Sequence, residues 1–135
     1  MSDLVVDTNQ RISVHNDLDI IVARLRAREI ARTLGFNTID QARISLAAGE
    51  LARGLVKNIG QMGEIIISGV KTEEHLGIQV MGVSKFNAPT HMETKPLPAR
   101  SHNDTLANVL QLVDEGFIED EGEQETRVTL MKWLS

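Results

Sequence analysis

Glu50 is the residue of this sequence whose type and setting most readily suggest chemistry. It lies in the run Gly49-Glu50-Leu51-Ala52-Arg53-Gly54, toward the edge of the apolar stripe of a helical projection. Two interpretations stay open. Glutamates at such positions are most often solvated and paired with a nearby arginine, here Arg53 or Arg43. Alternatively, a carboxylate at the rim of a cleft can take a proton from a hydroxyl group.

The other reactive side chains form no recognisable motif. The four histidines are His15, His75, His91 and His102. No two of them have the spacing that shares a helical face, so we predict no metal site. Ser68, Ser84 and Ser101 lack the context of a nucleophile elbow, and residues 82–86 lack the spaced glycines of a phosphate loop. Cysteine is absent, which excludes disulfides, thiolate metal sites and a cysteine nucleophile.

A strand and a helix are predicted at the start of the chain. Residues 11–16 alternate apolar and polar side chains, which is typical of a half-buried strand. Asn16 or Asp17 can then cap a helix whose apolar residues recur on one face. Gly35 is placed to end that helix.

A second helix is predicted to carry Glu50. It begins with a capping box at residues 38–41, with the Thr38 hydroxyl first and Gln41 three residues later, and it ends near residues 58–60. Gly49 and Gly54 lie inside it, and interior glycines often indicate the close approach of another element. Its apolar stripe comprises Ile44, Ala47, Ala48, Leu51, Leu55 and Ile59.

The next part of the chain predicts two strands and a loop. Residues 64–70 and 76–83 have strand composition, and the short polar link at 71–74 favours an antiparallel pair. Residues 84–103 contain all three prolines and predict one long irregular loop. Loops of this length in compact domains are usually functional or mobile.

The last part of the chain predicts a helix and two strands. The helix spans residues 104–115 and ends at Gly116, and residues 117–119 and 127–134 form strands across an acidic turn. The element order β-α-α-β-β-loop-α-β-β predicts an α/β fold, a two-layer sandwich of a mixed sheet and about three helices. We expect residues 1–135 to form a single domain.

Composition limits the function. Of the residues, 41% are apolar and 24% charged, and the net charge of -5 does not fit the concentrated basic surface that nucleic acids require. No apolar run approaches the roughly 20 residues of a membrane span, and the first residues do not resemble a signal peptide. We therefore expect a cytoplasmic protein that binds neither nucleic acid nor membrane. The densest basic run, Arg24, Arg26, Arg28 and Arg32, shares its helix with Asp17, Asp19 and Glu29.

Three stretches, taken in order, carry a resemblance to a known family. Residues 35–44 resemble the entry into its long helix, residues 50–53 match the start of its N box, and residues 106–115 with 126–134 resemble its last helix and strand. The family is that of the bacterial switch serine kinases of the RsbT and anti-sigma-factor type, within the histidine-kinase-like (GHKL) ATPase fold. The resemblance covers nearly the whole chain. It implies a kinase that uses ATP and magnesium to phosphorylate a serine of a STAS-domain antagonist.

The resemblance also implies roles for individual residues. Glu50 would be the catalytic base. An asparagine four residues later, on the same helical face, would hold Mg²⁺, but Gly54 stands there and has no side chain. Ser84 stands where the family has an aspartate that binds the adenine amino group, and Phe86 and Ala88 replace its spaced glycines.

The segment that resembles the phosphate-binding lid also departs from the family. Residues 95–104 contain no glycine, and their prolines remove amide donors. Asp104 sets a negative charge where phosphates should lie, which Lys95 and Arg100 could partly offset. The candidate cofactor-binding positions are therefore Gly54, Ser84, Lys95 and Arg100.

All three departures weaken the binding of the same ligand, Mg-ATP. Each removes charge-assisted interactions of about 1.5–3 kcal/mol, and together they approach the roughly 8 kcal/mol of a micromolar site. We expect ATP binding to be weak or absent, and the chain to be a non-catalytic regulator that binds a STAS-domain protein or another switch component. An active kinase that uses Glu50 stays an alternative, as does a dimerisation module whose aliphatic helices form a homodimer interface.

Overall fold

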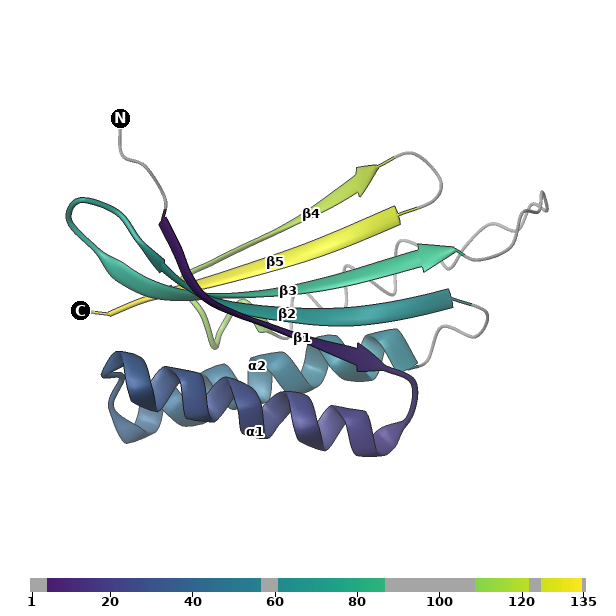
Figure 1. Cartoon of the computed structure of the whole chain (residues 1–135), viewed down its shortest axis with the longest axis horizontal. Helices are drawn as coiled ribbons and strands as arrows, with labels where there is room; N and C mark the ends of the chain where they lie inside the picture. Colours follow the sequence, from purple (N-terminus) through teal and green to yellow (C-terminus); the bar gives the residue numbers. More distant parts are fainter. Residues whose placement is uncertain (1–4, 57–60, 87–108, 122–124, 135) are drawn as a thin grey trace.

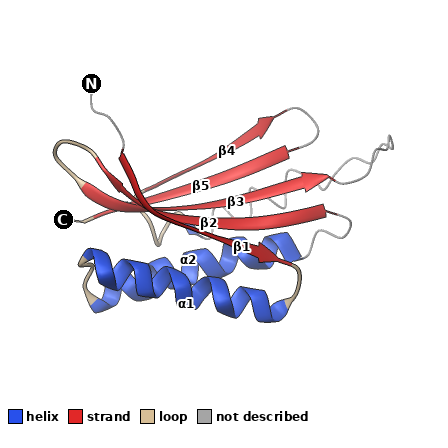
Figure 2. Cartoon of the chain, in the orientation of Figure 1, coloured by secondary structure: helices blue, strands red, loops and turns tan. Residues whose placement is uncertain are grey.

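Two helices cover one face of a five-stranded sheet with the strand order β1-β2-β3-β5-β4 (Figures 1 and 2). The computed structural model describes residues 5–56, 61–86, 109–121 and 125–134. The elements in chain order are β1 (Val5–Val14), α1 (Asp17–Leu34), α2 (Thr38–Val56), β2 (Gln61–Lys71), β3 (Leu76–Phe86), β4 (Glu115–Glu121) and β5 (Glu125–Trp133).

The predicted α/β sandwich is confirmed, but the prediction of a mixed sheet is wrong. All four strand pairings in the described part of the chain are antiparallel. The helices explain the pairing of β1 with β2. Because α1 and α2 run in opposite directions beneath the sheet (Figure 1), the chain returns to the end of the sheet where β1 stopped. β2 must therefore run back along β1.

The ends of α1 are those that the sequence predicts. The Asp19 N–H donates to Asn16 Oδ1 over 3.2 Å, and the Asn16 N–H donates to Asp19 Oδ2 over 3.3 Å. These reciprocal bonds form a capping box that satisfies two amide donors at the start of the helix. At the other end, Gly35 has a φ of 105°, a left-handed conformation that glycine adopts without a steric penalty.

The start of α2 lies where predicted, but the capping residue is different. The Asp40 N–H donates to Asn37 Oδ1 over 2.8 Å, so Asn37 caps the helix and the predicted role of Thr38 is wrong. Gln41 does not reach back to an amide as in a capping box. Its side-chain amide donates to the carbonyl of Phe36 over 2.8 Å, and Phe36 is buried. This contact fixes the turn that joins the two helices.

The third predicted helix does not extend to Glu115. Val109 is helical, residues 110–114 form a turn, and residues 104–108 lie outside the described residues. The Asp114 N–H donates to the carbonyl of Met131 over 2.9 Å, which draws the chain into the sheet. Gly116 therefore lies in β4, opposite Leu130, and does not end a helix.

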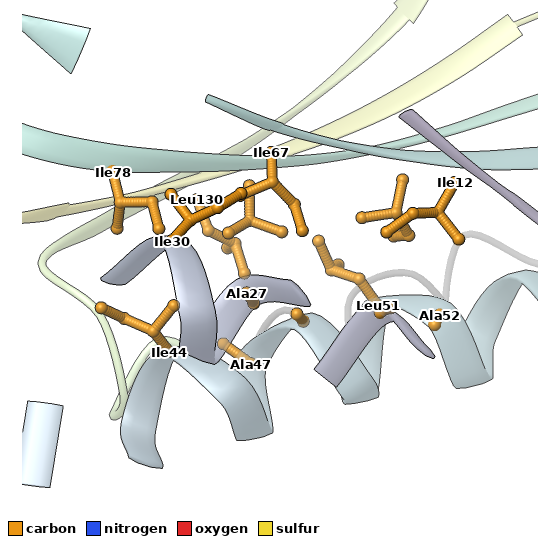
Figure 3. Packing of buried hydrophobic residues seen from close by; sticks show 14 of the residues in the cluster. Ile12, Ala27, Ile30, Ile44, Ala47, Leu51, Ala52, Ile67, Ile78 and Leu130 are labelled. Atoms are coloured by element: carbon orange, nitrogen blue, oxygen red, sulfur yellow. The ribbon is translucent and has the colours of Figure 1, made fainter. Parts of the chain in front are cut away.

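The core is aliphatic and lies between the helices and the sheet (Figure 3). Ile65 and Ile67 of β2 are fully buried in the same cluster as alanines of the two helices, and each large aliphatic side chain buried here contributes about 1.5–3 kcal/mol. Small residues let the helices approach each other. An added Cβ on Gly49 would lie 2.8 Å from the Arg24 side chain of α1, which confirms a close approach at this glycine.

The apolar stripe predicted for α2 is buried over its first four members. Its fifth member, Leu55, is half-buried, and Ile59 lies outside the described residues. The other four members are buried: Ile44, Ala47, Ala48 and Leu51.

Candidate functional site

The candidate site lies where the last turns of α2 meet the start of β2 and the end of β3 (Figure 1). We call this region the site end, defined as residues 50–56, 61–65 and 82–86. Close packing holds it together. An added Cβ on Gly63 would lie 2.9 Å from the Cβ of Leu55, and one on Gly82 would lie 3.6 Å from Leu51. Gly63 thus lets the sheet approach the helix that carries Glu50, whereas a Cβ at Gly82 would make an ordinary van der Waals contact.

Glu50 is a half-exposed residue with a partner on its own helix. Its Oε2 lies 3.6 Å from Nε of Arg53, and 36% of the Glu50 side chain is exposed. Of the two arginines proposed as partners, Arg53 is thus the one used. Arg43 pairs instead with Asp40, over 3.1 Å. An exposed pair of this kind contributes about 0–1 kcal/mol, so the pairing does not explain why a carboxylate stands here, and catalysis by Glu50 stays a prediction.

Gly54 lies one helical turn beyond Glu50 on the same face of α2. Side chains four residues apart on a helix lie about 5–6 Å from each other at Cβ. A side chain at position 54 could therefore share a ligand with Glu50, but glycine offers no donor. Asn58, one turn further along, lies outside the described residues.

Ser84 lies in β3 and does not begin a loop as the sequence predicts. It pairs with Gly63 of β2 and Thr126 of β5, and only 4% of it is exposed. Side chains alternate along a strand, so Ser84 shares the helix-facing side of β3 with Gly82 and Val80. The structure thus brings Ser84 to the same end of the sandwich as Glu50 and Gly54.

The other predicted contacts to nucleotide lie outside the described residues. These are Lys95 and Arg100, together with the rest of the predicted lid. Phe86 belongs to β3 by its backbone, opposite Gln61. The predicted roles of Lys95 and Arg100 therefore stay predictions.

The described residues of the site end fit a bound magnesium ion poorly. Magnesium takes oxygen ligands in a near-octahedral arrangement. Glu50 offers one carboxylate, which is paired with Arg53, and Glu64 of β2 pairs with Arg11 over 3.1 Å. In the described ranges, no group of three or more histidine, aspartate or glutamate side chains could hold a metal ion.

Sequence reasoning missed a cleft at the opposite end of the sandwich. It encloses about 550 Å³ beside the turn at residues 72–75. Lys132 lies in it between two carboxylates, with its Nζ 3.7 Å from Asp40 and 3.6 Å from Asp114. We call this region the cleft end, and its lining residues are Asp40, Thr72, His75, Asp114, Glu115, Lys132, Trp133 and Leu134. No local pattern could reveal it, because its residues come from separate segments.

Comparison with known proteins identifies a relative that is similar over nearly the whole chain. Over 129 residues the chain is 28% identical to the serine/threonine-protein kinase RsbT of Bacillus subtilis (strain 168), and the match covers 91% of this chain and 95% of that protein. No protein-family model matches the sequence. The extent of the match supports an RsbT-like relationship. No helix in the described ranges is long and apolar enough to cross a membrane.

Proposed function

We propose that this chain is a switch-kinase-like signalling regulator of the anti-sigma-factor type with a histidine-kinase-like (GHKL) ATPase fold. It binds a STAS-domain protein in the cytoplasm, and it binds Mg-ATP weakly or not at all. The proposal is supported by the similarity to RsbT over nearly the whole chain. The sandwich of two helices on an antiparallel sheet is compatible with it.

The observation that carries the proposal is the glycine at position 54. It lies one turn beyond Glu50, where the resemblance to the switch kinases requires the asparagine that holds Mg²⁺. Glu50 offers a single carboxylate, which lies 3.6 Å from the Arg53 guanidinium, so it does not replace the missing asparagine ligand. A magnesium ion would therefore lack the asparagine ligand that the resemblance places at position 54.

Ser84 is expected to weaken the binding of the nucleotide at its adenine end. A buried hydroxyl can accept a hydrogen bond from the adenine amino group. A neutral hydrogen bond contributes about 0.5–1.5 kcal/mol, compared with about 1.5–3 kcal/mol when one partner is charged. Serine in place of aspartate therefore reduces both the strength and the reach of this contact.

Titration calorimetry of the full chain with Mg-ATP tests the proposal. We expect no measurable heat of binding below about millimolar nucleotide, because the lost contacts are comparable to the whole free energy of a micromolar site. Micromolar binding by the unmodified chain would overturn the proposal.

A restoring variant sharpens this experiment. Gly54→Asn combined with Ser84→Asp returns the two side chains that the switch kinases use, and we expect it to bind Mg-ATP more tightly than the unmodified chain. Leu46→Asn is the matched control, because it adds an asparagine to an exposed position of the same helix. Equal gains in both variants would show that the effect is not specific to position 54.

The alternative is an active serine/threonine kinase that uses Glu50 as its base. It is favoured by the name of the relative and by the half-exposed carboxylate of Glu50. Under this alternative, labelled ATP and a STAS-domain protein give phosphoserine, and Glu50→Gln abolishes the product. Absence of phosphoserine with both forms of the chain, under conditions where RsbT is active, would argue against it.

A further inference from the structure

α1 exposes a row of large aliphatic side chains to solvent. Leu18 is 65% exposed, Ile21 51% and Leu25 61%. Their spacings of three and four residues place them along one side of the helix. Ala23 and Ala27, which are fully buried, lie on the opposite side. The row is therefore separate from the face with which α1 packs against the sheet and α2.

Two arginines continue the same row toward the end of α1. Arg28 and Arg32 follow Leu25 at three and seven residues, so they lie on the same side of the helix. Together with Leu25, Glu29 and Gln41 of α2 they line a shallow hollow of about 260 Å³. We call Leu18, Ile21, Leu25, Arg28 and Arg32 the α1 stripe. It is apolar over its first half and basic over its second.

The two arginines of the stripe form no ion pair within the described residues, although the Glu29 carboxylate lines the same hollow. Arg11, Arg43 and Arg53 each have a carboxylate partner. Arg24 and Arg26 of the same helix also form no ion pair with a described carboxylate, so Arg28 and Arg32 are distinguished by their position in line with the exposed aliphatic side chains of α1.

We propose that the α1 stripe is the docking surface for an amphipathic helix of a partner protein, with glutamates or aspartates toward one end of that helix. Helices dock in this way through apolar side chains that repeat at three and four residues. The partner's apolar residues would cover Leu18, Ile21 and Leu25. Its carboxylates would then lie beside Arg28 and Arg32, whose guanidinium groups bind carboxylates in bidentate geometry.

This inference goes beyond the proposed function because it assigns a surface and a partner chemistry without reference to nucleotide. Charge complementarity selects the occupant. An acidic helix neutralises the two arginines, whereas a purely apolar partner would leave them buried without a counter-charge. From Leu18 to Arg32 the stripe is about 21 Å long at 1.5 Å per residue, which suits a partner helix of about four turns.

Two synthetic peptides test the proposal against the full chain by fluorescence anisotropy. Each has about 18 residues and leucines at three- and four-residue spacing, and one carries glutamates toward its end where its twin carries lysines. We expect the acidic peptide to bind the chain about tenfold more tightly than the basic one, as expected for ion pairs with the two arginines. Arg28→Glu with Arg32→Glu should invert that preference.

Two further variants separate the apolar and charged contributions. Leu25→Asp should weaken both peptides by more than about tenfold, because it places a charge in the apolar half of the surface. Arg26→Glu is the matched control, since it reverses a charge on the same helix outside the stripe, where Arg26 donates to Gln10. Circular dichroism checks that every variant is folded.

Three results would overturn the proposal. One is equal affinity for the two peptides, and another is the absence of binding by either. A third is a dimer in light scattering that Leu25→Asp dissociates, since the stripe would then be an interface between two copies of this chain. The proposed function is tested separately by the Mg-ATP titration, so either proposal can fail while the other stands.

Discussion

The two ends of the sandwich are held together in different ways. At the site end, the described contacts between helix and sheet are apolar and close, such as Leu55 against Gly63. Of the ion pairs there, one joins Glu50 and Arg53 of the same helix, and another joins Glu64 of β2 to Arg11 of the neighbouring strand β1, so neither connects a helix to the sheet. At the cleft end, Lys132 of β5 lies between Asp40 of α2 and a carboxylate of the turn before β4. Charged groups there connect elements that are distant in sequence.

Hydrogen bonds reinforce the cleft end. The backbone N–H of Trp133 donates to Asp114 Oδ2 over 2.8 Å, and its indole N–H donates to Glu115 Oε2 over 2.9 Å. The Leu134 N–H donates to the carbonyl of Leu76 over 2.8 Å. These contacts fix the end of β5 against the start of β3 and the start of β4.

The difference shows where the fold depends on particular polar residues. Changing a charged residue at the cleft end removes contacts between elements. At the site end, the described packing of helix against sheet depends on apolar residues such as Leu51 and Leu55. Functional ends of proteins are often less stabilised than the rest. Changes to the exposed Glu50–Arg53 pair should therefore affect folding less than changes to Lys132.

The largest expected loss of stability comes from a methyl group added at Gly77, beside Lys132 and Trp133 of the cleft end. An added Cβ on Gly77 would lie 2.6 Å from the carbonyl oxygen of Lys132 and 2.7 Å from the Trp133 ring. Because a backbone atom cannot move aside easily, we expect Gly77→Ala to lower the free energy of unfolding by about 2–3 kcal/mol. Urea unfolding measures the change.

Gly49→Ala is the matched control for this substitution. Its added Cβ would meet the flexible Arg24 side chain at 2.8 Å, and alanine favours the helix by about 1 kcal/mol over glycine. The net change should lie within about 1 kcal/mol of zero. Equal losses for the two variants would contradict the argument from backbone contact.

The second prediction concerns Lys132, whose side chain is only 11% exposed. Lys132→Met removes the cation between Asp40 and Asp114 while keeping most of the side-chain volume. We expect a loss of about 1–2 kcal/mol, which is below the value for a fully buried pair because water reaches both carboxylates. Urea unfolding at neutral pH measures it. Arg53→Met at the site end serves as control, and a loss as large there would remove the contrast between the two ends.

A third, smaller effect distinguishes the two candidate caps of α2. Asn37→Ala removes the oxygen that accepts the Asp40 N–H and should destabilise the protein by about 1 kcal/mol. Thr38→Ala should change the free energy of unfolding by less than about 0.5 kcal/mol. Thermal unfolding of both variants measures these changes. The reverse order would restore Thr38 as the cap.

The smallest expected effect is that of Glu50→Gln at the site end. The substitution removes an exposed ion pair, so the free energy of unfolding should change by less than about 0.5 kcal/mol. For a regulator without kinase activity, the affinity for the STAS-domain protein should also be unchanged, as measured by calorimetry. A loss of stability above about 1 kcal/mol would show that Glu50 has a structural role.

Local signals predicted most of the secondary structure. Asn16 and Gly35 mark the ends of α1 because their bonds are made to residues within one or two turns. The cap of α2 was predicted one residue too late because Asn37 and Thr38 are both good caps. The choice between them depends on the contact of Gln41 with the carbonyl of Phe36.

Long-range contacts explain what could not be predicted. Asp114 turns the chain into β4 through bonds to Met131 and Trp133, and the latter is 19 residues away. The pairing of Glu50 with Arg53 was predictable because it follows from helical spacing. The cleft around Lys132 was not, because Asp40 of α2 and Lys132 of β5 lie far apart in the sequence and only the folded sandwich brings them together.

The strand order has a consequence for the synthesis of the chain. β5 lies between β3 and β4 in the sheet, although it follows both in the sequence. As the polypeptide leaves the ribosome, β4 has no neighbour until β5 emerges, and the edge of β3 presents unpaired backbone groups. β5 is the last strand to be made, and it connects β4 to the other three strands. The nascent sheet therefore stays open until residues 125–133 have been translated.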